Sequence, residues 1–128
     1  MDNVNTSTST YTADSLIVGD VDLVTDVGTI LSGQGELARG TVLGKVTASG
    51  KLIVCDKAAT GGTAGAEVPY AILADYADAT SADKSATVYK AGAFNSSALI
   101  LASGTTAADV KDAARGNGMY FYTVKAAV

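Results

Sequence analysis

Residues Arg39 to Phe94 read RGTVLGKVTASGKLIVCDKAATGGTAGAEVPYAILADYADATSADKSATVYKAGAF, and this stretch decides the fold. Short runs of Val, Leu, Ile and Tyr alternate with Gly-, Asp- and Ser-rich breaks, which is typical of short β-strands joined by turns. Two runs, 41–47 and 51–55, flank residues 48–50, whose glycine can supply the positive φ of a hairpin turn. Gly44 interrupts the first run and predicts a bulge or a close approach of another backbone.

Further short elements are predicted outward from this stretch. Within it, Pro69 opens a strand, because proline is tolerated at a strand start. Thr106 with Asp109 approximates a capping box, so a helix should begin there and end at Gly116. The remaining expectations are strands at 16–18, 21–24 and 27–31 with a turn at Gly19-Asp20, strands at 70–73, 86–90 and 119–124, a mobile loop at 60–66, a loop at 77–85, and a helical turn at 98–101 capped by Asn95 or Ser96.

The pattern as a whole predicts a mostly β member of the α+β class, with a few short helices. At 128 residues the chain has room for one core domain. Its 48% hydrophobic content overstates the core, because 23 of those residues are alanines, which bury little area. A domain with so modest a core gains from an oligomer interface, so we expect self-association.

Charge divides the chain into two unequal parts. Residues 1–38 carry six acids and no base, whereas residues 39–128 carry nine bases and seven acids. Because an acidic chain with scattered lysines offers no basic stripe, direct binding of nucleic acid is not expected. The acidic front end favours a partner surface that is neutral or basic.

The N-terminal part is predicted to be an arm, residues 1–20, ahead of a domain formed by residues 21–128. Residues 1–13 are polar and rich in Ser and Thr, so they bury too little to stay ordered alone. Their β-branched residues favour an extended form when a template strand is present; a tail without function is the alternative. No stretch approaches the roughly 20 apolar residues of a membrane span, and no signal peptide is recognised. The candidate arm residues are Thr8, Thr10, Tyr11, Leu16, Ile17 and Val18.

Reactive constellations are missing from the sequence. The chain has no histidine, so Ser-His-Asp and Cys-His pairs and His-containing metal sites are excluded. Cys55 lies in an apolar run and is interpreted as a small buried hydrophobe. Asp20 and Asp22 form a DxD pair whose simpler interpretation is a solvated edge, and residues 60–66 lack the lysine of a phosphate-binding loop. We therefore expect no enzyme, no metal and no cofactor.

Two further hypotheses remain open. Asp56-Lys57-Ala58 resembles the turn of lipoyl carrier domains, in which a lysine at a hairpin tip bears the cofactor. In that family an apolar strand follows at once, whereas here Ala59-Thr60-Gly61-Gly62 follows, so an exposed turn lysine is the simpler interpretation. The other hypothesis is a surface module that binds glycans, for which the six tyrosines offer stacking surfaces.

Four blocks taken in order resemble a known family. They are Leu37-Ala38-Arg39-Gly40-Thr41-Val42-Leu43-Gly44, then Gly50-Lys51-Leu52, then Pro69-Tyr70-Ala71-Ile72-Leu73-Ala74, and finally Val88-Tyr89-Lys90-Ala91-Gly92-Ala93-Phe94. Their order and spacing are similar to those of the head decoration proteins of tailed bacteriophages. The likeness covers roughly residues 35–125.

The resemblance implies a concrete set of expectations. It implies a β-clip-like decoration domain, made in the host cytoplasm, that sits as a homotrimer on the outer capsid surface at local three-fold positions. Its partner would be the major capsid protein of the expanded shell, which it would brace against packaged DNA, with no contact to nucleic acid or membrane. Residues proposed for the core or the trimer are Val42, Leu52, Ile72, Val88, Phe94 and Leu99.

Overall fold

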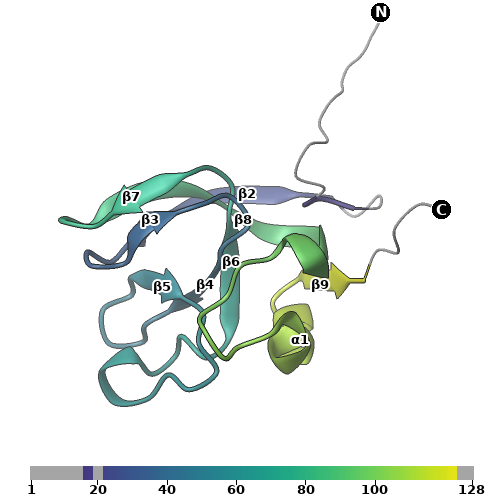
Figure 1. Cartoon of the computed structure of the whole chain (residues 1–128). Coiled ribbons are helices and arrows are strands. Elements are labelled where there is room, and N and C mark those ends of the chain that lie inside the picture. Colours follow the sequence, from purple (N-terminus) through teal and green to yellow (C-terminus); the bar gives the residue numbers. More distant parts are fainter. Residues whose placement is uncertain (1–15, 19–21, 124–128) are drawn as a thin grey trace, which may run out of the picture.

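The computed structural model describes residues 16–18 and 22–123. These residues form a small β-barrel-like body with one α-helix against its side (Figure 1). The strands are β2 (Val24–Ile30), β3 (Gly35–Leu37), β4 (Val42–Lys45), β5 (Leu52–Val54), β6 (Pro69–Leu73), β7 (Ala77–Ala79), β8 (Lys84–Asn95) and β9 (Met119–Tyr122). The helices are the 3-10 turns η2 (Gly61–Thr63) and η3 (Ser96–Ala98) and the α-helix α1 (Ala107–Gly116).

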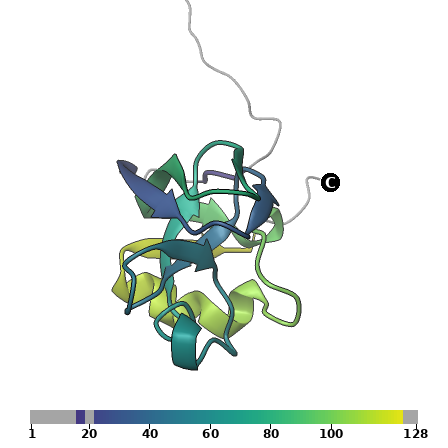
Figure 2. The ribbon, with the colours of Figure 1, turned by 90° about the vertical axis from the view of Figure 1, so that its left-hand side faces the viewer.

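Five strands close the barrel. The order is β2-β5-β4-β6-β8, and β2 also pairs with β8, so the sheet returns to its first strand (Figure 2). The contact between β2 and β5 is short, a parallel pairing of Ile30 with Leu52, whereas β2 and β8 pair antiparallel along the whole of β2. β3 and β7 form a separate antiparallel pair.

The 12-residue strand β8 pairs with three other strands, β2, β6 and β9. Its first part pairs with β2, and the register shift at Val24/Thr25 leaves Lys90 as an extra residue opposite β2. In a regular strand, alternate residues point their backbone groups toward opposite edges. The extra residue shifts this alternation by one position, so the part of β8 after Lys90 can pair with different neighbours. There β9 pairs in parallel on one edge and Ile17 bridges Phe94 on the other.

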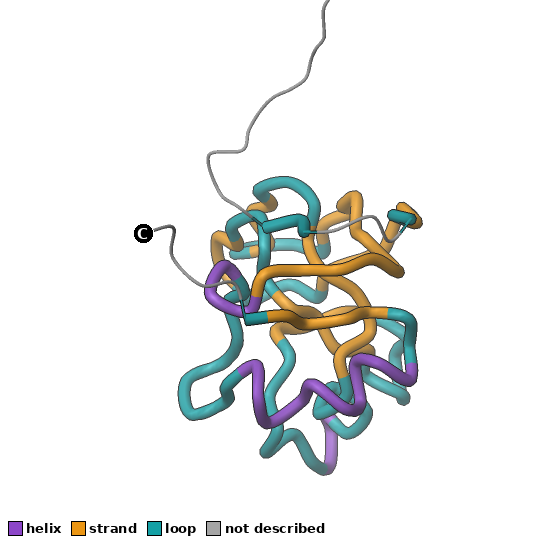
Figure 3. Tube along the Cα trace, turned by 90° about the vertical axis from the view of Figure 1, so that its right-hand side faces the viewer, coloured by secondary structure: helices purple, strands orange, loops and turns teal. Residues whose placement is uncertain are grey.

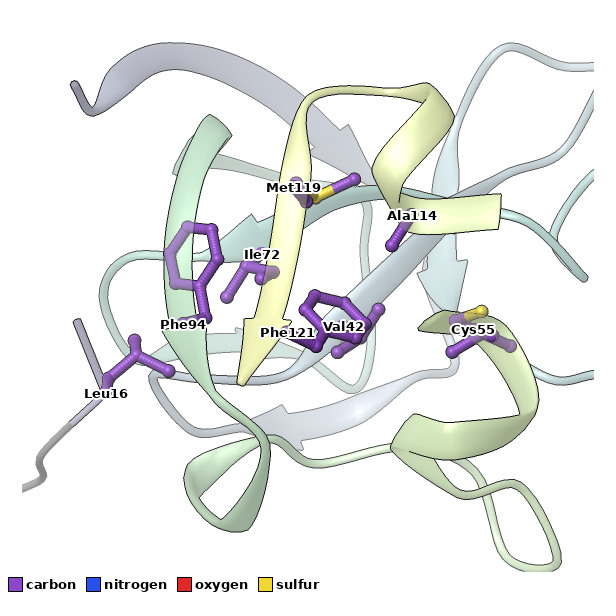
Figure 4. Close-up of a cluster of buried hydrophobic side chains, with 9 residues drawn as sticks. Leu16, Val42, Cys55, Ile72, Phe94, Ala114, Met119 and Phe121 are labelled. Atoms are coloured by element: carbon purple, nitrogen blue, oxygen red, sulfur yellow. The ribbon is translucent and has the colours of Figure 1, made fainter. Parts of the chain in front are cut away.

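Hydrophobic side chains form two main cores on opposite faces of the barrel wall. Adjacent residues of one strand enter different cores, because successive side chains of a strand point to opposite faces. Thus Leu43 lies in the inner core, inside the barrel, and Val42 lies in the outer core, beneath α1 and β9. Figure 4 shows the outer core, in which Phe94, Phe121 and Ile72 are wholly or almost wholly buried.

The helix α1 joins β8 to the parallel strand β9, as a crossover connection requires. Thr106 and Asp109 form a complete capping box at its start, and Val110 and Ala114 face the outer core. Figure 3 shows the helix lying along the strands that it covers. No helix within residues 16–18 and 22–123 is long and apolar enough to cross a membrane.

Several sequence predictions are confirmed. The fold is mostly β within the α+β class, as predicted. β4 and β5 form the expected hairpin, Gly50 has φ 73°, and α1 ends at Gly116. Gly44 lies at a register shift, and a methyl group there would lie 2.5 Å from Ala66 Cα, so the predicted close approach exists.

Other predictions are wrong. Residues 77–85, predicted as a loop, contain β7 and the start of β8. The predicted mobile loop at 60–66 contains η2 and ends in Ala66, which is wholly buried against Gly44. The strands at 21–24 and 27–31 are one strand, β2, because pairing with β8 carries Thr25 and Asp26 through the predicted gap. The helical turn predicted at 98–101 is η3, which begins earlier although Asn95 caps it as predicted, and β9 ends at Tyr122.

Candidate functional site

The described residues hold no group of side chains that could bind a metal ion. Cys55 is wholly buried, and this burial, together with the nearby Asp56 and Glu67, raises the pKa of its thiol to about 12. A thiol with this pKa is neutral at physiological pH, so it is a poor nucleophile. The interpretation of Cys55 as a buried hydrophobe is consistent with these values.

Lys57 does not have the setting of a cofactor-bearing lysine. Its ammonium lies 3.2 Å from Asp109 Oδ2, and its backbone N–H donates to Thr105 Oγ1 at 3.1 Å. The residues after it lead into η2, where a carrier domain would have a strand. The lysine therefore ties its turn to the start of α1, and the resemblance to a carrier rests on three residues alone.

The candidate arm residues fall into two groups. Thr8, Thr10 and Tyr11 lie outside the described residues. Leu16, Ile17 and Val18 lie along β8: Val18 N–H donates to Ala93 O at 3.0 Å, and Asn95 N–H donates to Leu16 O at 2.7 Å. Leu16 is 1% exposed and contributes to the outer core, so this segment is anchored in the folded body.

The candidate core residues divide between the two cores. Leu52 and Val88 lie in the inner core, whereas Val42, Ile72 and Phe94 lie in the outer core, all at or near zero exposure. Leu99 is partly buried against the outer core. Each of these side chains packs within the single chain and therefore stabilises the domain itself. A role at a trimer interface stays a prediction.

Polar side chains secure the region where β6 and β8 diverge. Arg39 donates to Tyr89 Oη at 2.6 Å and to Ala74 O at 3.1 Å. The ammonium of Lys90 donates to Tyr70 O at 2.7 Å, and Asn117 Nδ2 donates to Pro69 O at 2.8 Å. Sequence reasoning missed these contacts, since no spacing rule links a turn asparagine to a carbonyl 48 residues away.

Exposed apolar side chains gather along the start of β2. Leu23 is 40% exposed, Val24 50% and Val27 65%. Two exposed acids accompany them: Asp22 precedes Leu23, and Asp26 lies between Val24 and Val27 in the sequence. β2 runs along the top of the molecule in Figure 1, away from α1. The sequence analysis did not single out this strand as a candidate site. The signal that could have identified it is a predicted strand in which aspartates alternate with valines.

Comparison with known families identifies the chain. The family model of the bacteriophage lambda head decoration protein D matches residues 5–118, which is most of the sequence. A search of curated proteins found no match. The matched range contains the inner core, α1, the segment that lies along β8 and all of the outer core except the residues of β9. The family is a structural one that decorates the phage head, and the virion is where it acts. This chain belongs to the head decoration family of lambda protein D.

Proposed function

We propose that this protein binds the outer surface of the expanded phage head as a homotrimer at local three-fold sites. It contacts the major capsid protein there and stabilises the shell against the pressure of packaged DNA, without catalysing a reaction. The observation that carries the proposal is the family match over residues 5–118.

In this proposal the N-terminal arm forms a strand on an exposed sheet edge of the shell. Main-chain hydrogen bonds hold such a strand, and alternate side chains select its register. Ordering each residue costs roughly 1–2 kcal/mol, so one arm alone holds weakly. Three arms on one trimer bind together, and linked binding raises avidity by about 10²–10⁴. Because Leu16 is anchored in the outer core, the donated part is residues 1–15.

The charge of the chain fits a position outside the shell. The net charge is −4, and all the charged residues among the first 38 are acids. An acidic protein is repelled by packaged DNA but not by the outer face of the capsid. Binding to the expanded lattice alone stabilises that lattice by mass action. The protein is made in the host cytoplasm, where it meets the assembled heads.

The test is to mix the purified protein with expanded and with unexpanded empty heads and to measure which heads retain it by co-sedimentation. We expect retention by expanded heads only. A deletion of Met1–Ala13 should keep the trimer, measured by analytical ultracentrifugation, and lose head binding. Equal binding by the deleted protein would refute the arm, and a protein that stays monomeric at high concentration would refute the trimer. Failure of the full chain to bind either head, alongside hits on a glycan array, would favour a glycan-binding module.

A further inference from the structure

β2 has one edge that the described part of the chain leaves largely open. Its inner edge pairs with β8 from Val24 to Ile30. On its outer edge, β2 pairs within the described residues only at its end, where Ile30 pairs with Leu52 of β5. The N–H of the next residue, Leu31, donates to Leu52 O at 2.9 Å. An unpaired row of backbone groups on an edge strand is a ready template for another strand.

The direction of the open backbone groups follows from the hydrogen bonds. Leu31 N–H points away from β8 because it reaches β5. Opposite Val27, Thr87 turns its carbonyl away from β2 and accepts from Ala74 N–H at 3.0 Å. Alternate residues of an antiparallel pair point their backbone groups outward. The N–H and C=O groups of Thr25 and Val27 and the N–H of Thr29 therefore face the open edge, whereas the Thr29 carbonyl lies beside β5 at the Ile30–Leu52 pairing.

One of these groups carries an internal cap. Val27 N–H donates to the carboxylate of the neighbouring Asp26 at 2.8 Å. Native proteins use charged side chains on edge strands to prevent uncontrolled pairing. Asp26 is exposed and adjacent in sequence, so its carboxylate can leave the amide without any change in the fold.

Charge decides which kind of partner fits this edge. Asp22 and Asp26 flank the exposed Val24, and no basic residue lies among residues 1–38. Two copies that paired β2 with β2 would bring these acids together, and like charges opposite each other are destabilising. The N-terminal arm of another copy carries Asp2 and Asp14 and no base, so it is disfavoured for the same reason.

We infer that the outer edge of β2 accepts an extended segment of the shell protein as an added strand. A carbonyl of that segment replaces the Asp26 carboxylate at Val27 N–H, and a Lys or Arg of the segment pairs with the freed carboxylate. Apolar side chains of the segment cover Val24 and Val27. This inference rests on the proposed function and adds an acceptor site to it, separate from the donated arm.

A proline substitution tests the added strand directly. In Val27→Pro the missing N–H faces the open edge, so the ladder with β8 keeps its hydrogen bonds, as proline on an edge strand allows. The matched control is Val27→Thr, which keeps both the N–H and the β preference. Binding of the full chain to expanded heads should weaken at least about tenfold for Val27→Pro, which corresponds to about 1.4 kcal/mol, and change less than about threefold for Val27→Thr.

Two further measurements keep the inference testable if Val27→Pro fails to fold. Asp26→Lys should weaken head binding at least about tenfold, whereas Asp26→Asn, which can still cap Val27, should lose less and depend less on salt. Hydrogen exchange on the unaltered protein should show slower exchange at Thr25, Val27 and Thr29 when heads are present.

The outcomes separate the inference from the proposed function. An unaltered protein that does not bind heads overturns the function. If Val27→Pro binds heads as tightly as the unaltered protein does, and heads leave hydrogen exchange at the three amides unchanged, the acceptor site is overturned but the proposed function is not. Loss of the trimer in folded Val27→Pro also overturns it, because the edge would then serve self-association.

Discussion

Replacement of Leu16 by alanine tests where the folded body begins. Leu16 is 1% exposed and packs in the outer core beside Phe94, while Ile17 bridges the same residue. Truncating a buried leucine costs about 2–5 kcal/mol through lost transfer energy and the cavity that remains. Because only a short segment holds Leu16 in place, the cavity can partly collapse, so we expect the lower half of this range, about 2–3 kcal/mol.

The assay is thermal and urea unfolding followed by circular dichroism. For a domain of this size, about 2–3 kcal/mol lowers the Tm by roughly 10 °C. Val18→Ala is the matched control, because Val18 lies on the same segment but is only half buried; it should cost less than about 1 kcal/mol. A Tm for Leu16→Ala within about 2 °C of that of the unaltered protein would correspond to less than about 1 kcal/mol and would refute the inclusion of this segment in the core.

Two further predictions concern the Cys55 thiol and the side chain of Asn117. The pKa of Cys55 is about 12 in the folded protein against 9.0 for an ordinary thiol, so the stability from the neutral thiol is complete below pH 9 and is lost as the pH rises toward 12. As the pH rises from 9 toward 12, the urea midpoint should therefore decrease less steeply for Cys55→Val than for the unaltered protein. Equal slopes for the two proteins would contradict this prediction. Asn117→Ala leaves Pro69 O without its donor and should cost about 1 kcal/mol in urea unfolding; Asn117→Asp, which also cannot donate, should lose at least as much, and a smaller loss would show that the bond to Pro69 does not matter.

Local chemistry made part of this fold predictable. The turn at Gly50, the capping box at Thr106 and the end of α1 at Gly116 are all decided within a few residues, so sequence alone locates them. The close approach at Gly44 was also predictable, because a glycine within a strand run has few other uses.

Long-range pairing made the rest inaccessible. Asp26 is of a type depleted in strands, yet it lies within β2 together with Thr25, because β8 pairs with both from more than 60 residues away. The short strand β7 exists because β3 lies beside it. Among the candidate site residues, burial of Leu16 against Phe94 could not be foreseen, since an apolar triplet after a polar arm is equally typical of a free strand. Propensity gives way to tertiary context at such positions.

The extra residue in β8 explains how one side of the molecule can offer both a donor and an acceptor. Before Lys90, β8 pairs with β2 on one edge and β6 on the other; after it, the same edges take residues 16–18 and β9. Residues 16–18 and β2 therefore follow one another along the same edge of β8. The proposed arm precedes Leu16 in the sequence. The segment that begins at Leu16 and the strand β2, with its open outer edge, both pair with the same 12-residue strand β8. A shell segment on β2 and an arm on the shell would thus be fixed relative to each other by one rigid element, so binding of the first pre-orients the second. Preorganisation of this kind lowers the ordering cost of the second contact, so under this proposal a small, alanine-rich domain would hold neighbouring subunits firmly.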